Sequence, residues 1–249
     1  MRLAVLSDIH SNLEALEAAL AEVDRAGVDR IVSCGDLVGY NADPNEVLDR
    51  LRAIPRFVSV MGNHDAVACG LEEPEGFAAV ARKAAEWTRK VLDQENRAYL
   101  RRLQTHQDLG DGVFLAHGSW RDRDAYLLDA SRARPDLEAF EREATGGRLL
   151  LIGHTHYPVA FLRQRGEARI ETDFSDSVVL SPERLAIVNV GSVGQPRDGD
   201  PRLSLVLVDT DAGLVERRRV EYPVKRAADK VRAMEGLPDY LADRLLEGR

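Results

Sequence analysis

The sequence predicts a mixed α/β (α+β) fold, in which two β-sheets pack face to face as a sandwich flanked by helices. Two observations lead to this prediction. The first sixty residues alternate between short apolar runs and amphipathic helices, whereas short apolar runs dominate from residue 112 onward. We find no internal repeat and no linker rich in proline, glycine or serine, so we expect residues 1–249 to form a single domain.

The N-terminal part is expected to form strand–helix–strand units around a parallel sheet. Short apolar runs predict buried strands at residues 3–6, 31–34 and 57–61. Ser11, followed three residues later by Glu14, predicts a capping box at the start of the first helix, and Gly27 stands where that helix should end. A second helix is expected over residues 45–53.

The middle of the chain is expected to carry a helical insertion over residues 75–104, with Asp93 capping its second helix. After it, short apolar runs predict strands at 112–116, 149–152, 159–164, 168–172, 177–180, 185–190, 203–209 and 214–221. One helix around 136–144 should interrupt these strands. The tail, residues 224–246, is expected to form two short amphipathic helices.

Composition and charge exclude several classes of protein. The 42 acidic residues exceed the 34 basic ones and give a formal net charge of -8, which argues against a surface that binds long nucleic acids. No window of the sequence is long and apolar enough to span a bilayer, and the first apolar run is too short for a signal peptide. The two cysteines form no C-x-x-C pair, so neither a disulfide framework nor a thiolate zinc site is indicated. We therefore expect a soluble, cytoplasmic protein with no membrane partner.

Five short motifs, each placed directly after a predicted strand, contain most of the histidines of the chain. They are Asp8-Ile9-His10, Gly35-Asp36-Leu37-Val38-Gly39, Gly62-Asn63-His64-Asp65, His117-Gly118 and Gly153-His154-Thr155-His156. Ligands bind beyond the carboxyl ends of the strands in α/β sheets, so these motifs can converge on one crevice. Four of the glycines, Gly35, Gly62, Gly118 and Gly153, are expected to let the backbone turn sharply there. A hydrogen-bonded polar cluster is the alternative, but five such motifs in order favour a metal site.

The five motifs resemble those of the calcineurin-like metallophosphoesterase superfamily, in the same order and with similar separations. Within that superfamily the sequence is most similar to the small bacterial and archaeal phosphoesterases, because the segment from Gly191 to Arg197 is also similar to one of theirs. The resemblance extends over residues 3 to about 200. It implies a fold of two sheets between helices, in agreement with the strands predicted above.

The resemblance also implies a site for two divalent metal ions. Asp8, His10 and His156 would hold one ion, Asn63, His117 and His154 the other, and Asp36 would bridge both. Nitrogen and oxygen donors without a thiolate suit Mn, the ion we expect, and also Fe, Zn, Co or Ni. Two such ions, about 3.5–4 Å apart, can share a bridging hydroxide that attacks phosphorus.

His64 is the motif histidine without a metal in this scheme. We expect it to protonate the leaving oxygen or to stabilise the charge that develops on phosphorus, with Asp65 orienting its imidazole.

Four further residues are candidates for substrate binding. Trp120, Arg123 and Tyr126 follow His117 in a loop-like segment that can reach over the site, and Arg197 follows a tight glycine turn. A structural salt bridge is the alternative for Arg197. Because 30 of the 34 basic residues are arginines, an arginine near the site also fits a general bias of composition.

The predicted function is metal-dependent hydrolysis of small phosphoesters, as a phosphodiesterase or phosphatase. The alternative is a hydrolase of diadenosine polyphosphates or other nucleotides, because residues 75–104 and 118–135 provide extra walls that can seat a nucleoside. A nuclease is disfavoured by the net charge. A protein phosphatase and a non-catalytic scaffold are the remaining classes, although a scaffold would be expected to have lost metal ligands.

Overall fold

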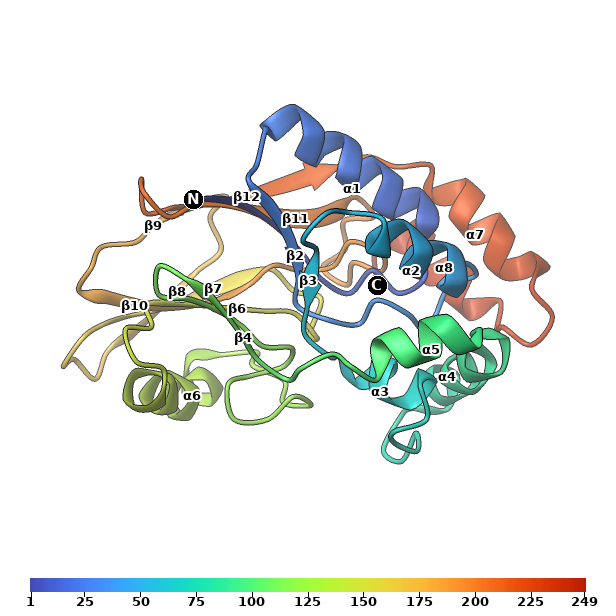
Figure 1. The fold of residues 1–249 in the computed structure, drawn as a ribbon, viewed down its shortest axis with the longest axis horizontal. Helices are drawn as coiled ribbons and strands as arrows, with labels where there is room; N and C mark the ends of the chain where they lie inside the picture. Colours follow the sequence, from blue (N-terminus) through green and yellow to red (C-terminus); the bar gives the residue numbers. More distant parts are fainter.

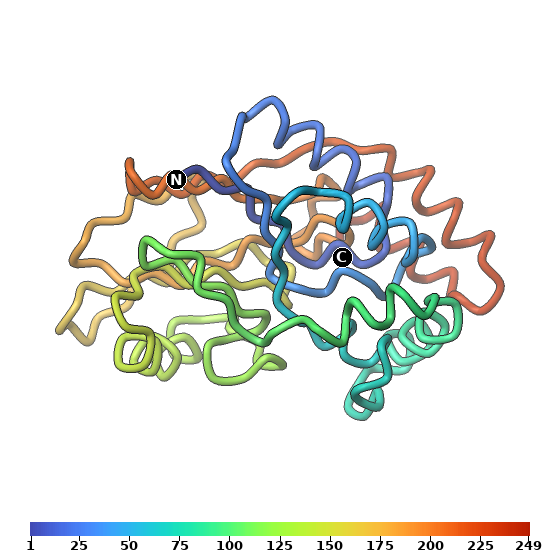
Figure 2. Tube along the Cα trace, in the orientation of Figure 1, coloured from blue at the N-terminus to red at the C-terminus, as the bar shows by residue number.

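A computed structural model describes all 249 residues, and it contains two six-stranded sheets with helices on their outer faces (Figures 1 and 2). The first sheet has the strand order β3-β2-β1-β11-β12-β9 and the second the order β4-β5-β6-β10-β7-β8. This arrangement confirms the predicted two-sheet sandwich. None of the helices combines the length and the apolar character that crossing a membrane requires.

The first sheet joins the two ends of the chain. Its strands are β1 (Arg2–Leu6), β2 (Arg30–Ser33), β3 (Val58–Ser59), β9 (Ser177–Val179), β11 (Leu203–Asp209) and β12 (Leu214–Val220). β1, β2 and β3 run parallel, as the strand–helix alternation predicts, whereas β11 pairs antiparallel with β1. Three parallel strands of this sheet therefore end at the same edge.

The second sheet contributes three more parallel strands. It comprises β4 (Gln107–Gly110), β5 (Val113–Leu115), β6 (Leu149–Ile152), β7 (Val159–Gln164), β8 (Ile170–Asp173) and β10 (Arg184–Asn189). β5, β6 and β10 are parallel neighbours, and β7 and β8 continue the sheet in antiparallel pairing. The sequence did not predict β4, a largely polar strand at the sheet edge that pairs only with β5.

The structure contains eight helices. They are α1 (Leu13–Ala26), α2 (Pro44–Arg52), α3 (Asn63–Ala68), α4 (Ala79–Val91), α5 (Gln94–Leu100), α6 (Ala130–Glu143), α7 (Val224–Ala233) and α8 (Tyr240–Glu247). α4 and α5 form the predicted insertion, with Asp93 as the N-cap of α5, and α7 and α8 are the two predicted C-terminal helices.

The ends of two helices differ from prediction. α1 is capped by Asn12, whose side chain accepts a hydrogen bond from the Ala15 backbone N–H, and not by Ser11, whose hydroxyl accepts one from the Gly39 N–H. α6 begins six residues earlier than expected. Asp129 caps its first turn, and the helix accommodates Pro135 in its interior.

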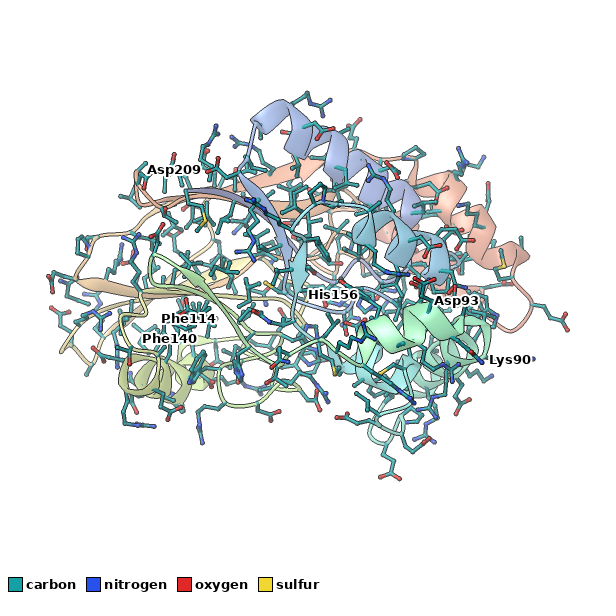
Figure 3. All side chains as sticks on the ribbon, viewed as in Figure 1. Lys90, Asp93, Phe114, Phe140, His156 and Asp209 are labelled. Carbon is teal, nitrogen blue, oxygen red and sulfur yellow. The ribbon has the colours of Figure 1, made fainter.

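The sandwich is held together by apolar side chains that alternate along each strand. In β1, Leu3 and Val5 belong to the core between the two sheets, while Ala4 and Leu6 face the core beneath α1 and α2. A third core lies between α6 and the second sheet, where the rings of Phe114 and Phe140 meet edge to face at 5.5 Å (Figure 3). Both sheets are thus buried on both faces, which fixes the edge at which their parallel strands end.

A fourth, smaller core joins α4 to α7 and α8, so that the insertion and the C-terminal helices pack on each other. Tyr40, from the loop after β2, also belongs to it. The last helix of the chain is thereby brought to the same edge as the loops after the first strands.

Candidate metal centre

The residues of the five motifs follow the strands β1, β2, β3, β5 and β6, and they converge at this common edge. Several have left-handed backbone conformations that non-glycine residues rarely adopt: φ is 51° at Asp8, 47° at His10, 51° at Asp36, 65° at His154 and 62° at His156. Each such conformation costs about 1–3 kcal/mol, and residues of this kind cluster at functional sites. These backbone conformations lower the stability of the fold, but they direct the five side chains toward one point.

One cluster of potential ligands consists of Asp8, His10 and His156, all buried. His156 Nε2 lies 3.2 Å from Asp8 Oδ1, and His10 Nε2 lies 3.7 Å from the same oxygen. The two Nε2 atoms are 3.1 Å apart. The three donor atoms are close enough together to bind a single cation.

Backbone carbonyls fix the tautomers of both imidazoles in this cluster. His10 Nδ1 lies 3.0 Å from the Val38 carbonyl oxygen, and His156 Nδ1 lies 2.5 Å from that of Gln195. A carbonyl oxygen only accepts, so each Nδ1 must carry the hydrogen. In a neutral ring, the lone pair then sits on Nε2 and points into the cluster.

A proton placed between the two Nε2 atoms would give one of the two buried rings a positive charge. Burial lowers the pKa of His10 well below its ordinary value and also lowers the pKa of His156, so both rings are neutral near pH 7. Two lone pairs therefore face each other at 3.1 Å beside the Asp8 carboxylate, whose Oδ1 accepts no hydrogen bond. A cation satisfies all three atoms, and the residues present fit a metal ion.

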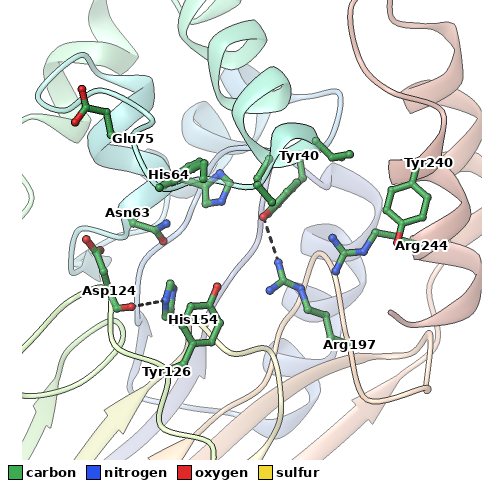
Figure 4. A pocket seen from close by; sticks show the side chains of 15 residues that line it. Tyr40, Asn63, His64, Glu75, Asp124, Tyr126, His154, Arg197, Tyr240 and Arg244 are labelled. Atoms are coloured by element: carbon green, nitrogen blue, oxygen red, sulfur yellow. Dashed lines mark hydrogen bonds between the residues drawn. The ribbon is translucent and has the colours of Figure 1, made fainter.

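The second cluster consists of Asp36, His117 and His154, again buried. His117 Nδ1 donates to the Cys34 carbonyl oxygen at 2.8 Å and its Nε2 lies 3.4 Å from Asp36 Oδ2. Asn63 Oδ1 approaches the same Nε2 to 3.2 Å. In His154 the ring is turned, because Nε2 donates to the Asp124 carbonyl oxygen at 3.1 Å and leaves Nδ1 for the cluster (Figure 4).

Asp36 lies between the two clusters. Its Oδ2 is 3.4 Å from His117 Nε2 and 3.6 Å from His10 Nε2, while Oδ1 is fixed by the backbone N–H of His64 at 2.9 Å. Burial alone would raise the pKa of Asp36, but the adjacent imidazole of His117 holds it well below the ordinary value. One ionised carboxylate oxygen thus faces both sets of histidines.

His117 differs from the other histidines in charge. Burial alone would lower the pKa of His117, but the carboxylate of Asp36 outweighs it and raises the pKa to about 9. By contrast, burial together with the charge of His117 lowers the pKa of His154 to about 3. The second cluster therefore holds one exchangeable proton near pH 7, on His117.

Two glycines allow the loops to approach each other closely. A Cβ atom on Gly62 would lie 2.0 Å from Asp36 Oδ1, and one on Gly153 would lie 2.3 Å from Asp8 Oδ2. Of the four glycines expected to make sharp turns, Gly35 alone has a positive φ, 95°. At Gly62, Gly118 and Gly153 the requirement is therefore space against neighbouring atoms, not an unusual backbone conformation.

His64 lines a cavity of about 550 Å³ next to the clusters, and its ring contacts Tyr40 and Phe77. Its Nδ1 is buried without a hydrogen-bond partner. Burial lowers the pKa of His64 to about 4, so the ring is neutral near pH 7. A neutral imidazole still carries one N–H that can donate to an oxygen in the cavity.

Asp65 does not orient the His64 imidazole, and this prediction is corrected. Its two carboxyl oxygens accept from the Val38 and Gly62 backbone N–H groups, at 3.1 Å each. Asp65 therefore ties the loop after β2 to the start of α3. Burial, assisted by the negative charge of Asp36, raises the pKa of Asp65 to about 7.

The structure brings two of the four predicted substrate contacts to the cavity. Arg197 and Tyr126 line it, and the Tyr126 ring lies 4.2 Å from that of His154 (Figure 4). Trp120 and Arg123 do not line it. Trp120 packs between Phe114 and Phe140 and donates to Glu143, because these rings bury its apolar surface.

Arg123 is occupied by ion pairs with Glu72 and Asp124, which join two loops beside the cavity. This arrangement corrects its predicted role as a substrate contact. Three further cavity residues were not predicted: Tyr40, Tyr240 and Arg244. Tyr40 follows the Gly35–Gly39 motif directly, which is a usable signal, but nothing in the sequence connects α8 with the site.

Comparisons with known proteins agree with this geometry. Residues 1–213 match the family model of the calcineurin-like phosphoesterase superfamily domain. An uncharacterised protein of Methanocaldococcus jannaschii is 34% identical over 252 residues, covering 99% of this chain and 98% of that protein. A crystal structure of a metallophosphoesterase from Sphaerobacter thermophilus is 37% identical with a TM-score of 0.84, covering 100% and 99% of the two chains. A hypothetical protein from Pyrococcus horikoshii, at 21% identity and a TM-score of 0.80 over 100% and 98% of the chains, shares the fold.

Replacing Gly62 by alanine should weaken metal binding, because the new methyl group would displace the Asp36 carboxylate. We expect affinity for Mn²⁺ to fall about 10–100-fold, as for other losses of ligand support. Elemental analysis of the dialysed protein measures this, and circular dichroism checks the fold. Gly76→Ala, where a Cβ would meet no atom within 4 Å, is the control. Full metal content in Gly62→Ala would contradict the role assigned to this contact.

Metal affinity should depend on pH because binding displaces the proton of His117. With a pKa of about 9 in the metal-free protein, this proton is present at neutral pH, so affinity is expected to rise about tenfold per pH unit from pH 6 to pH 8 and to level off near 9. Calorimetric titration with Mn²⁺ in buffers of different ionisation enthalpy counts the protons released. His106→Gln, at the surface histidine, should leave the slope unchanged. An affinity that does not change with pH would contradict the prediction.

Proposed function

Because the chain belongs to the calcineurin-like phosphoesterase superfamily, we propose that it hydrolyses phosphoesters of small molecules with two divalent metal ions. The observation that carries the proposal is the pair of Nε2 atoms of His10 and His156, 3.1 Å apart, with both Nδ1 atoms committed to carbonyls. Such an arrangement is unfavourable without a cation, and a second donor cluster lies beside it.

In this proposal Asp8, His10 and His156 hold one ion, Asn63, His117 and His154 the other, and Asp36 contacts both. The all-nitrogen and oxygen donor set suits Mn, and also Fe, Zn, Co or Ni. When bound, two divalent ions lower the pKa of a shared water and neutralise charge on the phosphoryl oxygens.

The reaction adds water across a P–O bond. Oxygen from water bonds to phosphorus, the bond to the leaving oxygen breaks, and that oxygen must gain a proton. Arg197 lines the cavity and can donate to the non-bridging phosphoryl oxygens. His64 lines the same cavity, and its neutral ring can offer an N–H to the leaving oxygen.

The cavity favours a small substrate. Its volume of about 550 Å³ is typical of small-molecule sites, and aromatic rings from Tyr40, Phe77, Tyr126 and Tyr240 line it. Glu75 and Asp124 stand at the same cavity, and together with the net charge of -8 they disfavour a long polyanion. The aromatic lining also supports the alternative, a nucleotide or diadenosine polyphosphate, whose bases can stack there.

A panel of substrates with added Mn²⁺ tests the proposal. We expect hydrolysis of bis(p-nitrophenyl) phosphate, p-nitrophenyl phosphate, a cyclic nucleotide or diadenosine tetraphosphate that EDTA abolishes and added Mn²⁺ restores. Asp36→Asn should lose at least about 100-fold in kcat, because the residue facing both clusters loses its charge. Asp111→Asn, at an exposed position with the same φ of 51°, is the matched control. No turnover by a Mn-loaded protein on any substrate would overturn the proposed function.

Replacing His64 by alanine should slow turnover without removing metal. The expected loss in kcat is about 100–10,000-fold for esters with an alkoxide leaving group, which needs a proton, and much smaller for p-nitrophenolate, which does not. Rates across a series of leaving groups, together with elemental analysis, measure both effects. An equal loss of metal and activity would make His64 a ligand, and an equal loss for all leaving groups would exclude proton donation.

A further inference from the structure

Two arginines line the cavity without an aspartate or glutamate partner. Arg197 comes from the loop after β10 and Arg244 from α8, and the hydrogen bonds of both go to other groups. Figure 4 shows both guanidinium groups on the same side of the cavity, with Glu75 and Asp124 on the other side. A guanidinium without an acidic side chain beside it in a partly buried cavity leaves positive charge that an anionic ligand can offset.

Most of the hydrogen-bond donors of these arginines are unused. Arg197 Nη2 donates to Gln195 Oε1 at 3.1 Å and lies 3.4 Å from the Tyr40 hydroxyl, while its buried Nε has no partner. Arg244 donates only from Nε, to a main-chain oxygen of the last residue, Arg249, at 2.5 Å. This bond gives Arg244 a structural role at the chain terminus, but it leaves both Nη groups without a protein acceptor.

Aromatic rings and helix packing hold the two groups in place. The Arg197 Cζ lies 5.6 Å from the centroid of Tyr40, and the Arg244 Cζ lies 5.9 Å from that of Tyr240. On α8, the buried Leu241 and Leu245 anchor the helix against α4 and α7. Arg244 is therefore presented by a packed helix and not by a loose terminus.

Arg197 lies nearer to the first ligand cluster than Arg244 does. Arg197 donates to the side-chain oxygen of Gln195, and the backbone carbonyl of the same residue accepts from His156. Arg197 therefore stands next to the first cluster. Arg244 lies further out, on α8. Burial lowers the pKa of Arg244, and the positive charge of Arg197 lowers it further.

We propose that Arg197 and Arg244 form a second anion subsite, and that the substrate carries another phosphoryl group beyond the scissile phosphoester. This inference rests on the proposed function and names its substrate class. A phosphoryl dianion offers three acceptor oxygens, which matches the free donors of two guanidinium groups and offsets their repulsion. Nucleoside polyphosphates and bisphosphorylated sugars both have this chemistry, and the aromatic cavity walls favour the nucleotide.

The test compares two ligands that cannot be hydrolysed, methylenediphosphonate and methylphosphonate, by calorimetric titration of the Mn-loaded protein. We expect the wild type to bind the diphosphonate at least about tenfold more tightly. Arg244→Gln should reduce that ratio at least about fivefold, and Arg244→Lys should restore part of it because the charge returns without the planar fork. Arg232→Gln, which removes an ion pair between α7 and α8 outside the cavity, should keep the wild-type ratio.

Steady-state kinetics give a second readout, the ratio of kcat/KM for a substrate with two phosphoryl groups to kcat/KM for bis(p-nitrophenyl) phosphate. The two substrates compared are ADP and a bisphosphorylated sugar. We expect this ratio to fall in Arg244→Gln, mainly through KM, and the substrate with the larger fall identifies the source of the second phosphoryl group. An unchanged ratio in both experiments, with the variant folded by circular dichroism, overturns the subsite. Failure of the wild type to hydrolyse any ester, with the ligand ratio still dependent on Arg244, overturns the proposed function and retains the subsite.

Discussion

The unfavourable contact between His10 Nε2 and His156 Nε2 is the constraint on which the rest of the site depends. Each ring is locked by a carbonyl on its other nitrogen, so neither can turn away or exchange tautomers without losing a buried hydrogen bond. The left-handed backbone at five ligand positions and the glycines that admit Asp8 and Asp36 add further cost. Without a cation, all of these features would only lower the stability of the fold. This cost supports the interpretation of the cluster as a candidate metal centre.

Most of the sandwich could be predicted because its strands are buried and apolar. The exceptions have physical reasons. α3 has six residues and begins on the motif residue Asn63. Its first turn is held by the distant Asp36 carboxylate and by the local bond from the Gly62 N–H to Asp65, instead of by an apolar stripe. β4 is an edge strand with Gln107 and Asp108, so its sequence lacks the apolar pattern of the central strands. Asn12, and not Ser11, caps α1, because the hydroxyl of Ser11 accepts a hydrogen bond from a neighbouring loop.

The candidate ligands could be predicted for a different reason: each follows a strand, and parallel strands of both sheets end at one edge. What could not be predicted are contacts made between distant segments. Trp120 and Arg123 are close to His117 in sequence, yet Trp120 finds aromatic partners on α6 and Arg123 finds carboxylates. Arg244 is far from every motif in the sequence and reaches the cavity because α8 packs on α7 and shares an apolar core with α4. Proximity along the chain was a poor guide here, and shared apolar packing decided the outcome.

For an acidic chain, the proposed action on anions requires positive charge that is placed locally. The net charge of -8 repels polyanions at a distance, while Arg197 and Arg244 place positive charge within one cavity, beside the two clusters that could bind metal ions. Glu75 and Asp124 on the opposite side of that cavity then limit where an anion can lie. A ligand with charge at both the metal edge and the α8 edge fits this distribution, whereas a chain of phosphates running out of the cavity would meet acidic surface. The proposed preference for small, highly charged substrates thus rests on where the charges are, and α8 is the element that extends the positive region beyond the motif loops.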